Sequence, residues 1–365
     1  MTLNNLKKYW RRNGGLRRRP DRGFRRLAAG AAALVLAVVF GFFAAPASAF
    51  DPGTGPEILL PIRCQPGRDC WLVNLVDLDP GPGVRDFACG AKTYDGHKGT
   101  DIAVRDMKAV AKGVEVVAAA AGVVKGVRDG MADVDVAQAG RDSVKGRECG
   151  NGVVVDHGGG WETQYCHMRR GSIAVKQGDN VEAGARLGQV GHSGDAEFPH
   201  LHLSVRRSGQ VVDPFVGTKR TDACGLGPNP LWQKAALAQL MRPMTAVFNA
   251  GFHDAKPAAR AARDGLLAAA ALPRNAGALV LWADMYWVEA GDVLAFRIVG
   301  PDGKPIFQNS TRIEKTQARR FAFAGRQRRA ETWPAGAYVG EVTLTRGEGG
   351  QAKTISSVTV GIELR

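Results

Sequence analysis

The segment Phe198-Pro199-His200-Leu201-His202-Leu203-Ser204-Val205 sets two of the seven histidines of this 365-residue chain two positions apart, inside an apolar run. A short apolar run of this kind is typical of a β-strand. Residues i and i+2 of a strand project from the same face, about 6.6 Å apart along the chain. We therefore expect His200 and His202 to point together into one site.

Other short β-type runs precede this segment and alternate with glycines. They begin at Gly113, Gly122, Gly152, Glu162 and Val181. Closely spaced short strands with turn residues between them indicate an antiparallel β domain. We expect this domain, an antiparallel β-sheet or sandwich, to cover residues 85–216, and the chain to be mainly β.

The C-terminal part of the chain shows two further patterns. Residues 217–275 are expected to form a linker and a helical segment, because residues 230–241 space their apolar side chains as a helix does and residues 258–272 are rich in alanine. Residues 276–365 return to alternating strands, with a Pro-Asp-Gly-Lys turn at 301–304. We expect a small immunoglobulin-like β-sandwich there. Nothing in it suggests catalysis, and a protein partner is one expected role.

The first 49 residues have the features of an export signal. Residues 1–26 hold ten Lys or Arg against one acid, residues 27–45 are an uninterrupted apolar run, and Pro46-Ala47-Ser48-Ala49 follows. This order indicates a secretory signal peptide cleaved after Ala49. The length of the apolar run makes an uncleaved membrane anchor the alternative, and that segment is the expected membrane contact. In both cases the remainder is exported, to the periplasm or out of the cell.

The net charge of the chain is concentrated in this leader. The formal charge of +14 falls to about +5 once the ten basic residues and one acid of residues 1–49 are set aside. The high overall charge is therefore mostly a targeting signal, and it argues against nucleic acid as a partner. A mildly basic mature chain suits an anionic wall polymer.

The chain has an even number of cysteines, all in the exported part: Cys64, Cys70, Cys89, Cys149, Cys166 and Cys224. Outside the cytoplasm they indicate up to three disulfides. Closeness in sequence favours Cys64–Cys70, which would staple an irregular lead-in over residues 50–84. Neighbouring strands favour Cys149–Cys166, which leaves Cys89–Cys224. A zinc–thiolate site is disfavoured, because no two cysteines have Cys-x-x-Cys spacing.

Two further histidines and an aspartate have the character of metal or catalytic residues. His97 lies four residues before Asp101 in a glycine-rich turn, and His167 ends a strand. Two imidazoles and one carboxylate can hold zinc tetrahedrally with one position left for water, as in catalytic sites. Because neighbouring strand residues face opposite sides, we expect Cys166 to point away from His167, so that its disulfide lies behind the site.

These motifs, in this order and at this spacing, resemble the lysostaphin-type (LytM-like) zinc endopeptidases, which cut peptidoglycan peptides. The matching stretches are His97-Lys-Gly-Thr-Asp-Ile-Ala103, Tyr165-x-His167, the turn segment 181–194 and His200-x-His202. The resemblance covers residues 85–216 and says nothing about residues 231–365. It implies a lysostaphin-like peptidase fold and a zinc cofactor.

Carried over to this chain, the resemblance implies zinc ligands at His97, Asp101 and His202. It implies that His167 and His200 handle the substrate and the attacking water, without saying which of them is the general base. The expected function is an exported zinc metalloendopeptidase that hydrolyses peptide bonds in peptidoglycan stem peptides or crosslinks. The alternatives are a non-catalytic peptidoglycan-binding or amidase-activating module of the same fold, and a peptidase acting on proteins. Degenerate family members lose ligands, so the presence of all five positions favours catalysis.

Overall fold

The computed structural model describes residues 53–219, 223–267, 269–347 and 349–365. The predicted export signal, residues 1–49, lies outside the described residues. Within the described ranges, no helix combines the length and the apolar character needed to cross a bilayer. The fold is mainly β, with antiparallel sheets, as the sequence predicts.

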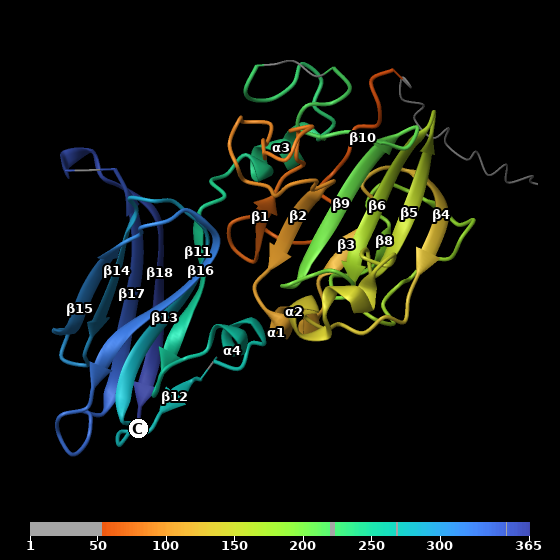
Figure 1. Ribbon diagram of the computed structural model, residues 1–365. Coiled ribbons are helices and arrows are strands. Elements are labelled where there is room, and N and C mark those ends of the chain that lie inside the picture. The colour runs from red at the N-terminus through yellow and green to blue at the C-terminus, as the bar shows by residue number, and fades with distance from the viewer. Residues whose placement is uncertain (1–52, 220–222, 268, 348) are drawn as a thin grey trace, which may run out of the picture. The chain divides into compact units, whose positions relative to one another are not determined.

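The largest sheet contains eight strands, in the order β1-β2-β9-β6-β5-β4-β7 with β10 beside β9 (Figure 1). All of its pairings are antiparallel. Its strands are Cys70–Asn74 (β1), Thr100–Val104 (β2), Gly122–Arg128 (β4), Asn151–Gly158 (β5), Trp161–Met168 (β6), Asn180–Val181 (β7), His200–Arg207 (β9) and Gln210–Val211 (β10). Strand β1 lies in the lead-in that was expected to be irregular. Its run Cys-Trp-Leu-Val-Asn forms a strand there, since it pairs with β2 and all five residues are buried.

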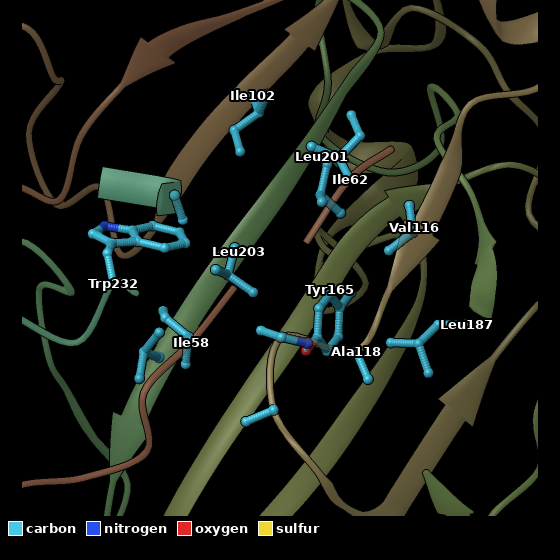
Figure 2. Close-up of a cluster of buried hydrophobic side chains, with 14 of the residues drawn as sticks. Ile58, Ile62, Ile102, Val116, Ala118, Tyr165, Leu187, Leu201, Leu203 and Trp232 are labelled. Carbon is cyan, nitrogen blue, oxygen red and sulfur yellow. Dashed lines mark hydrogen bonds between the residues drawn. The ribbon is translucent and has the colours of Figure 1, made fainter. Parts of the chain in front are cut away.

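One face of this sheet packs on the first hydrophobic core. Leu201, Leu203 and Val205 alternate along β9 into that core, and Tyr165 joins them from β6. A two-stranded sheet, β3 (Glu115–Val117) and β8 (Arg186–Gln189), contributes Val116 and Leu187 to the same cluster (Figure 2). Because the core takes one set of alternating side chains, the other set, which includes His202, is left for the opposite face.

The helices are short: Met107–Lys112 (α1), Val136–Ala139 (α2), Lys234–Leu240 (α3) and Ala259–Arg263 (α4), with 3-10 turns at Arg141–Val144 (η1) and Gly349–Gln351 (η2). The first is capped by Asp106, whose carboxylate accepts a hydrogen bond from the Ala109 amide. The alanine-rich stretch 258–272 gives only α4, because Gly265, at φ +74°, follows the last turn in the left-handed region. A short strand then ends the stretch.

The remaining strands form two further sheets, with orders β11-β13-β16 and β12-β18-β17-β14-β15. Their bounds are Ala246–His253 (β11), Ala271–Leu272 (β12), Ala278–Val288 (β13), Val293–Val299 (β14), Pro305–Arg312 (β15), Gln317–Gln327 (β16), Gly336–Arg346 (β17) and Lys353–Leu364 (β18). A second core combines Leu281 of β13 with Phe296 of β14 and Val342 of β17. The two sheets therefore pack face to face as a β-sandwich. Its strand β11 lies in the range expected to be linker and helix.

All three expected disulfides are present: Cys64–Cys70, Cys89–Cys224 and Cys149–Cys166. The described residues contain no free cysteine.

Candidate metal centre

Three predicted ligand residues meet on one face of the large sheet. Asp101 on β2 pairs directly with His202 on β9, and His97 reaches them from the loop before β2. The His97 Nε2 atom lies 3.2 Å from Asp101 Oδ1 and 3.1 Å from His202 Nδ1, and the latter two atoms are 2.8 Å apart. The three potential ligand atoms therefore lie close together, although two of their residues are 105 positions apart in the sequence.

The hydrogen bonds of the other ring nitrogens set the tautomers. His97 Nδ1 donates to the carbonyl oxygen of Leu75 at 2.6 Å, which leaves a lone pair on its Nε2. The Ser204 hydroxyl donates to the carbonyl of Lys98 at 2.8 Å and therefore accepts from His202 Nε2 at 3.0 Å. His202 Nδ1 consequently carries a lone pair as well.

This arrangement fits a cation. With both imidazoles neutral, two nitrogen lone pairs and a carboxylate oxygen converge with no hydrogen between them, and a positive charge at their centre relieves the repulsion. A tetrahedral zinc ion with bonds of about 2.0–2.2 Å needs ligand atoms about 3.3–3.5 Å apart. The observed 2.8–3.2 Å is within about half an ångström of that separation. The donor set, two nitrogens and one oxygen, is one that zinc accepts.

The other two predicted residues lie beside this triangle. His200 Nδ1 donates to the carbonyl of Phe198 at 2.8 Å, and its Nε2 lies 3.7 Å from Asp101 Oδ1. His167 Nδ1 donates to the carbonyl of Ser193 at 2.8 Å, and its ring centroid lies 4.5 Å from that of His200. Both rings therefore hold their Nδ1 proton on the backbone and keep an Nε2 lone pair.

A β-bulge places His167 in the site. Between the pairs Asn151–Met168 and Val153–Tyr165, strand β6 has one more residue than β5, and His167 takes φ +60° at that point. The extra residue breaks the alternation. Tyr165 and Met168 both belong to the hydrophobic core, whereas the two residues between them, Cys166 and His167, both line the groove on the opposite face.

The expected orientation of Cys166 was therefore wrong. Cys166 pairs directly with His202 across the strands, and together with Cys149 it lines the groove that His97 and His202 also line. The disulfide is part of the site wall and does not lie behind it. Strict alternation predicted the opposite face, and the bulge removes that alternation.

Burial and nearby charges lower the pKa of two site histidines and raise the pKa of a third. Burial lowers the pKa of His167 well below its ordinary value, with His200 and His202 adding to the effect. Burial also lowers the pKa of His200, although Asp101 opposes it. Burial acts the same way on His97, but there the Asp101 carboxylate outweighs it and raises the pKa of His97. Burial would raise the pKa of Asp101, yet His97 and His200 hold it well below its ordinary value.

Comparison with known protein families identifies the family to which this part of the chain is similar. The model of peptidase family M23 matches residues 95–214, which include all five of the predicted site residues. The chain contains a peptidase family M23 domain.

Curated relatives match over short stretches of the chain. The DD-carboxypeptidase/endopeptidase Mpg of Neisseria meningitidis is 44% identical over 72 residues, which is 19% of this chain and 16% of Mpg. The peptidoglycan DD-endopeptidase ShyA of Vibrio cholerae is 39% identical over 64 residues, 18% of this chain and 14% of ShyA. The chain thus matches about a sixth of each relative's length, so the likeness concerns a domain.

Solved structures align with low scores. The catalytic domain of a variant of the prophage-encoded M23 protein EnpA from Enterococcus faecalis aligns at 24% identity over 44% of this chain and 95% of its own, with a TM-score of 0.29. A peptidase M23 structure from Pseudomonas aeruginosa aligns at 28% identity over 46% and 52%, with a TM-score of 0.27.

The M23 domain has a groove of about 740 Å³, and three of the five predicted site residues line it. His97, His167 and His202 line it, and β9, β6 and β5 supply its floor through Ser204, Gln164 and Val154. A groove floored by strands is open to an extended peptide.

Four positions that orient the M23 site had not been singled out from the sequence. Asn74 Nδ2 donates to Asp101 Oδ2 at 2.8 Å. The Leu75 carbonyl holds the ring of His97, the Ser193 carbonyl holds that of His167, and the Ser204 hydroxyl holds that of His202. Strand periodicity could have found Ser204, which lies two residues after His202. Nothing local marks the other three, because they belong to different segments that meet only in the folded chain.

The remaining described histidines have other surroundings. His157 bonds the Ala121 carbonyl through Nδ1 and Thr163 Oγ1 through Nε2, each at 2.8 Å, as a structural residue would. His192 is buried in its turn, and His253 bonds the nearby Ala255 carbonyl at 3.0 Å.

Proposed function

We propose that the M23 domain is a zinc endopeptidase that hydrolyses peptide bonds in peptidoglycan stem peptides or crosslinks. The observation that carries the proposal is the convergence of His97 Nε2, Asp101 Oδ1 and His202 Nδ1 as three unprotonated atoms at the edge of an open groove. The relative ShyA, whose name states peptidoglycan endopeptidase activity, supports the substrate class.

In this proposal His97, Asp101 and His202 hold the ion. A bound zinc ion supplies Lewis acidity, which polarises a carbonyl group and makes water more acidic. Asn74, Ser204 and the Leu75 carbonyl keep the three ligands in the tautomer and orientation that present lone pairs.

His167 and His200 act on the reacting atoms. Each is held by a backbone carbonyl through Nδ1–H, so each presents an Nε2 lone pair to the site. Burial lowers the pKa of both rings, which keeps them neutral and able to accept a proton from the attacking water. Once protonated, a ring can donate to the leaving amine or to the developing charge on the carbonyl oxygen.

The proposed place of action follows from the substrate. Peptidoglycan lies outside the cytoplasm, and the predicted export signal over residues 1–49 would deliver the domain there. The predicted disulfides, all present in the structure, are of the kind that form in such a compartment.

The test uses purified protein, zinc and a defined crosslinked muropeptide, with product masses and bound zinc as separate readouts. Wild type should bind one zinc per chain and release new amino termini. His202→Ala should lose both zinc and cleavage, whereas His167→Ala and His200→Ala should keep zinc and lose cleavage. His253→Ala, a histidine outside the site, is the matched control and should behave as wild type.

Three results would redirect the proposal. A zinc-loaded wild type that sediments with peptidoglycan and releases no products would indicate a binding or amidase-activating module. Cleavage of unfolded proteins with no cleavage of muropeptides would indicate a peptidase acting on proteins. Equal cleavage by wild type and His202→Ala would remove the metal site from the mechanism.

A further inference from the structure

Arg206 lies on the groove face of the strand that carries the proposed ligand His202. The two residues are four positions apart on β9 with Ser204 between them, and all three line the groove. At the rise of a strand, four residues correspond to about 13 Å. That is the length of about four residues of an extended peptide, so Arg206 is within reach of a substrate bound across the metal.

The guanidinium of Arg206 has no carboxylate partner among the described residues. Glu162 is its direct cross-strand neighbour on β6, but Glu162 pairs with Lys125. A half-buried arginine on a strand would ordinarily be satisfied by such a neighbour. Here that acid is engaged elsewhere, so the five N–H donors of Arg206 have no carboxylate partner among the described residues.

The rest of the groove lining also contains more basic than acidic residues. Lys98, Arg128 and Arg147 line it together with two acids. Of these acids, Asp195 pairs with Arg141 at 3.5 Å, and Glu148 accepts a hydrogen bond from the Gly146 amide at 2.6 Å. With Arg206 the lining has four basic residues against two acids, and this balance favours a peptide with negative charges.

We propose that Arg206 is a specificity-determining residue that binds a carboxylate of the substrate peptide at a distance from the scissile bond. An arginine fork matches a carboxylate with two parallel hydrogen bonds, and a carboxamide cannot replace that pair. The inference rests on the proposed function. It narrows the substrate class to wall peptides with a free carboxylate at that position, in preference to their amidated forms.

The experiment compares one crosslinked muropeptide with versions in which each free carboxylate in turn is a carboxamide. For wild type, one such amidation should lower kcat/KM about 10- to 100-fold, the range for losing a charge-assisted bidentate contact. In Arg206→Gln, cleavage of the acid form should fall by that factor, and the amidated form should be cut as by wild type. Arg206→Lys should retain part of the preference.

Arg207→Gln is the matched control. Arg207 is the next residue on β9 and faces the other side of the sheet, with its guanidinium 5.6 Å from the Trp161 ring centroid. Both variants lose one positive charge, so a general electrostatic effect would change them equally. Zinc content and far-UV circular dichroism of Arg206→Gln should match wild type, and Arg206→Lys serves if the glutamine variant does not fold.

Three outcomes would overturn the inference while the proposed function stands. Wild type could cut the acid and every amidated form at equal rates, or Arg206→Gln could keep the full preference. An equal loss of preference in Arg207→Gln would also overturn it. If wild type cuts no muropeptide at all, the proposed function itself fails, and this result differs from all three.

Discussion

The hydroxyl of Ser204 accepts a hydrogen bond from His202 Nε2 at 3.0 Å and donates one to the Lys98 carbonyl at 2.8 Å. Ser204 is fully buried. This pair of bonds fixes the ring of His202 with Nδ1 toward Asp101. We expect Ser204→Ala to weaken zinc affinity about 10- to 100-fold, the usual cost of removing such an orienting partner.

A competition titration against a chelating dye measures this change in affinity. Ser143→Ala is the control, because the exposed Ser143 hydroxyl only bonds the nearby Gly140 carbonyl. Equal zinc affinities of wild type and Ser204→Ala would show that the ring of His202 is held in place without this hydroxyl.

Metal binding should stabilise the folded chain, because the three lone pairs converge in the folded state and are dispersed in the unfolded one. Free zinc at 100 times its Kd should add about 2.7 kcal/mol to the free energy of unfolding. Thermal melts with zinc and with a chelator measure the effect. His202→Ala should show no rise. Magnesium at the same concentration should have little effect, since imidazole is a poor ligand for it. A comparable rise with magnesium would contradict a nitrogen-based site.

The Cys149–Cys166 disulfide should support activity more than metal binding. The Cys149 carbonyl accepts a hydrogen bond from the His167 amide at 2.8 Å, and Cys166 is the preceding residue of the bulge. We expect the double variant Cys149→Ser with Cys166→Ser to lose about 10- to 100-fold in kcat, because a shift of about 1 Å in a reacting group has effects of that size. Zinc content should be unchanged.

The matched control for this disulfide is the double variant Cys64→Ser with Cys70→Ser, which opens a bridge outside the groove. Its kcat should match that of wild type. If both double variants lose activity equally, disulfides act here through overall stability and not through His167.

Tyr165 should contribute a measurable part of the stability of the peptidase core. Its hydroxyl accepts a hydrogen bond from the buried Ala119 amide at 2.7 Å and lies 2.9 Å from Thr163 Oγ1. Tyr165→Phe leaves that amide without a partner, which costs about 1–3 kcal/mol. Urea denaturation measures the loss, and zinc binding should persist. An unchanged midpoint would indicate that another group satisfies the Ala119 amide.

His157 should make stability depend on pH. Burial lowers its pKa below the ordinary value of 6.5. The unfolded chain therefore binds a proton that the folded chain resists, so stability should fall as the pH drops below about 6.5 toward the folded pKa. Melting temperatures from pH 7.5 to pH 5 should fall less steeply for His157→Gln than for wild type. Parallel curves would mean that His157 is not protonated on unfolding in that range.

The amino-acid sequence was sufficient for features that depend on local geometry and on counting. The two-residue repeat of a strand places His200 and His202 together on β9. Six cysteines, with one pair close in sequence and one pair expected on neighbouring strands, lead to the three bridges that are present. The order of the His and Asp motifs indicated the same family whose model matches residues 95–214.

Only the tertiary structure decided how the site residues are oriented. The bulge that turns Cys166 and His167 to one face depends on the register of β6 against β5, which is set over the whole pairing and not by the two residues themselves. The tautomers depend on carbonyls such as those of Leu75 and Ser193, which lie 22 and 26 residues from the rings they hold. The two-residue repeat of a strand is set by a few successive backbone bonds and can be read from the sequence. A contact that orients a ring depends on where distant segments pack, so only the folded structure shows it.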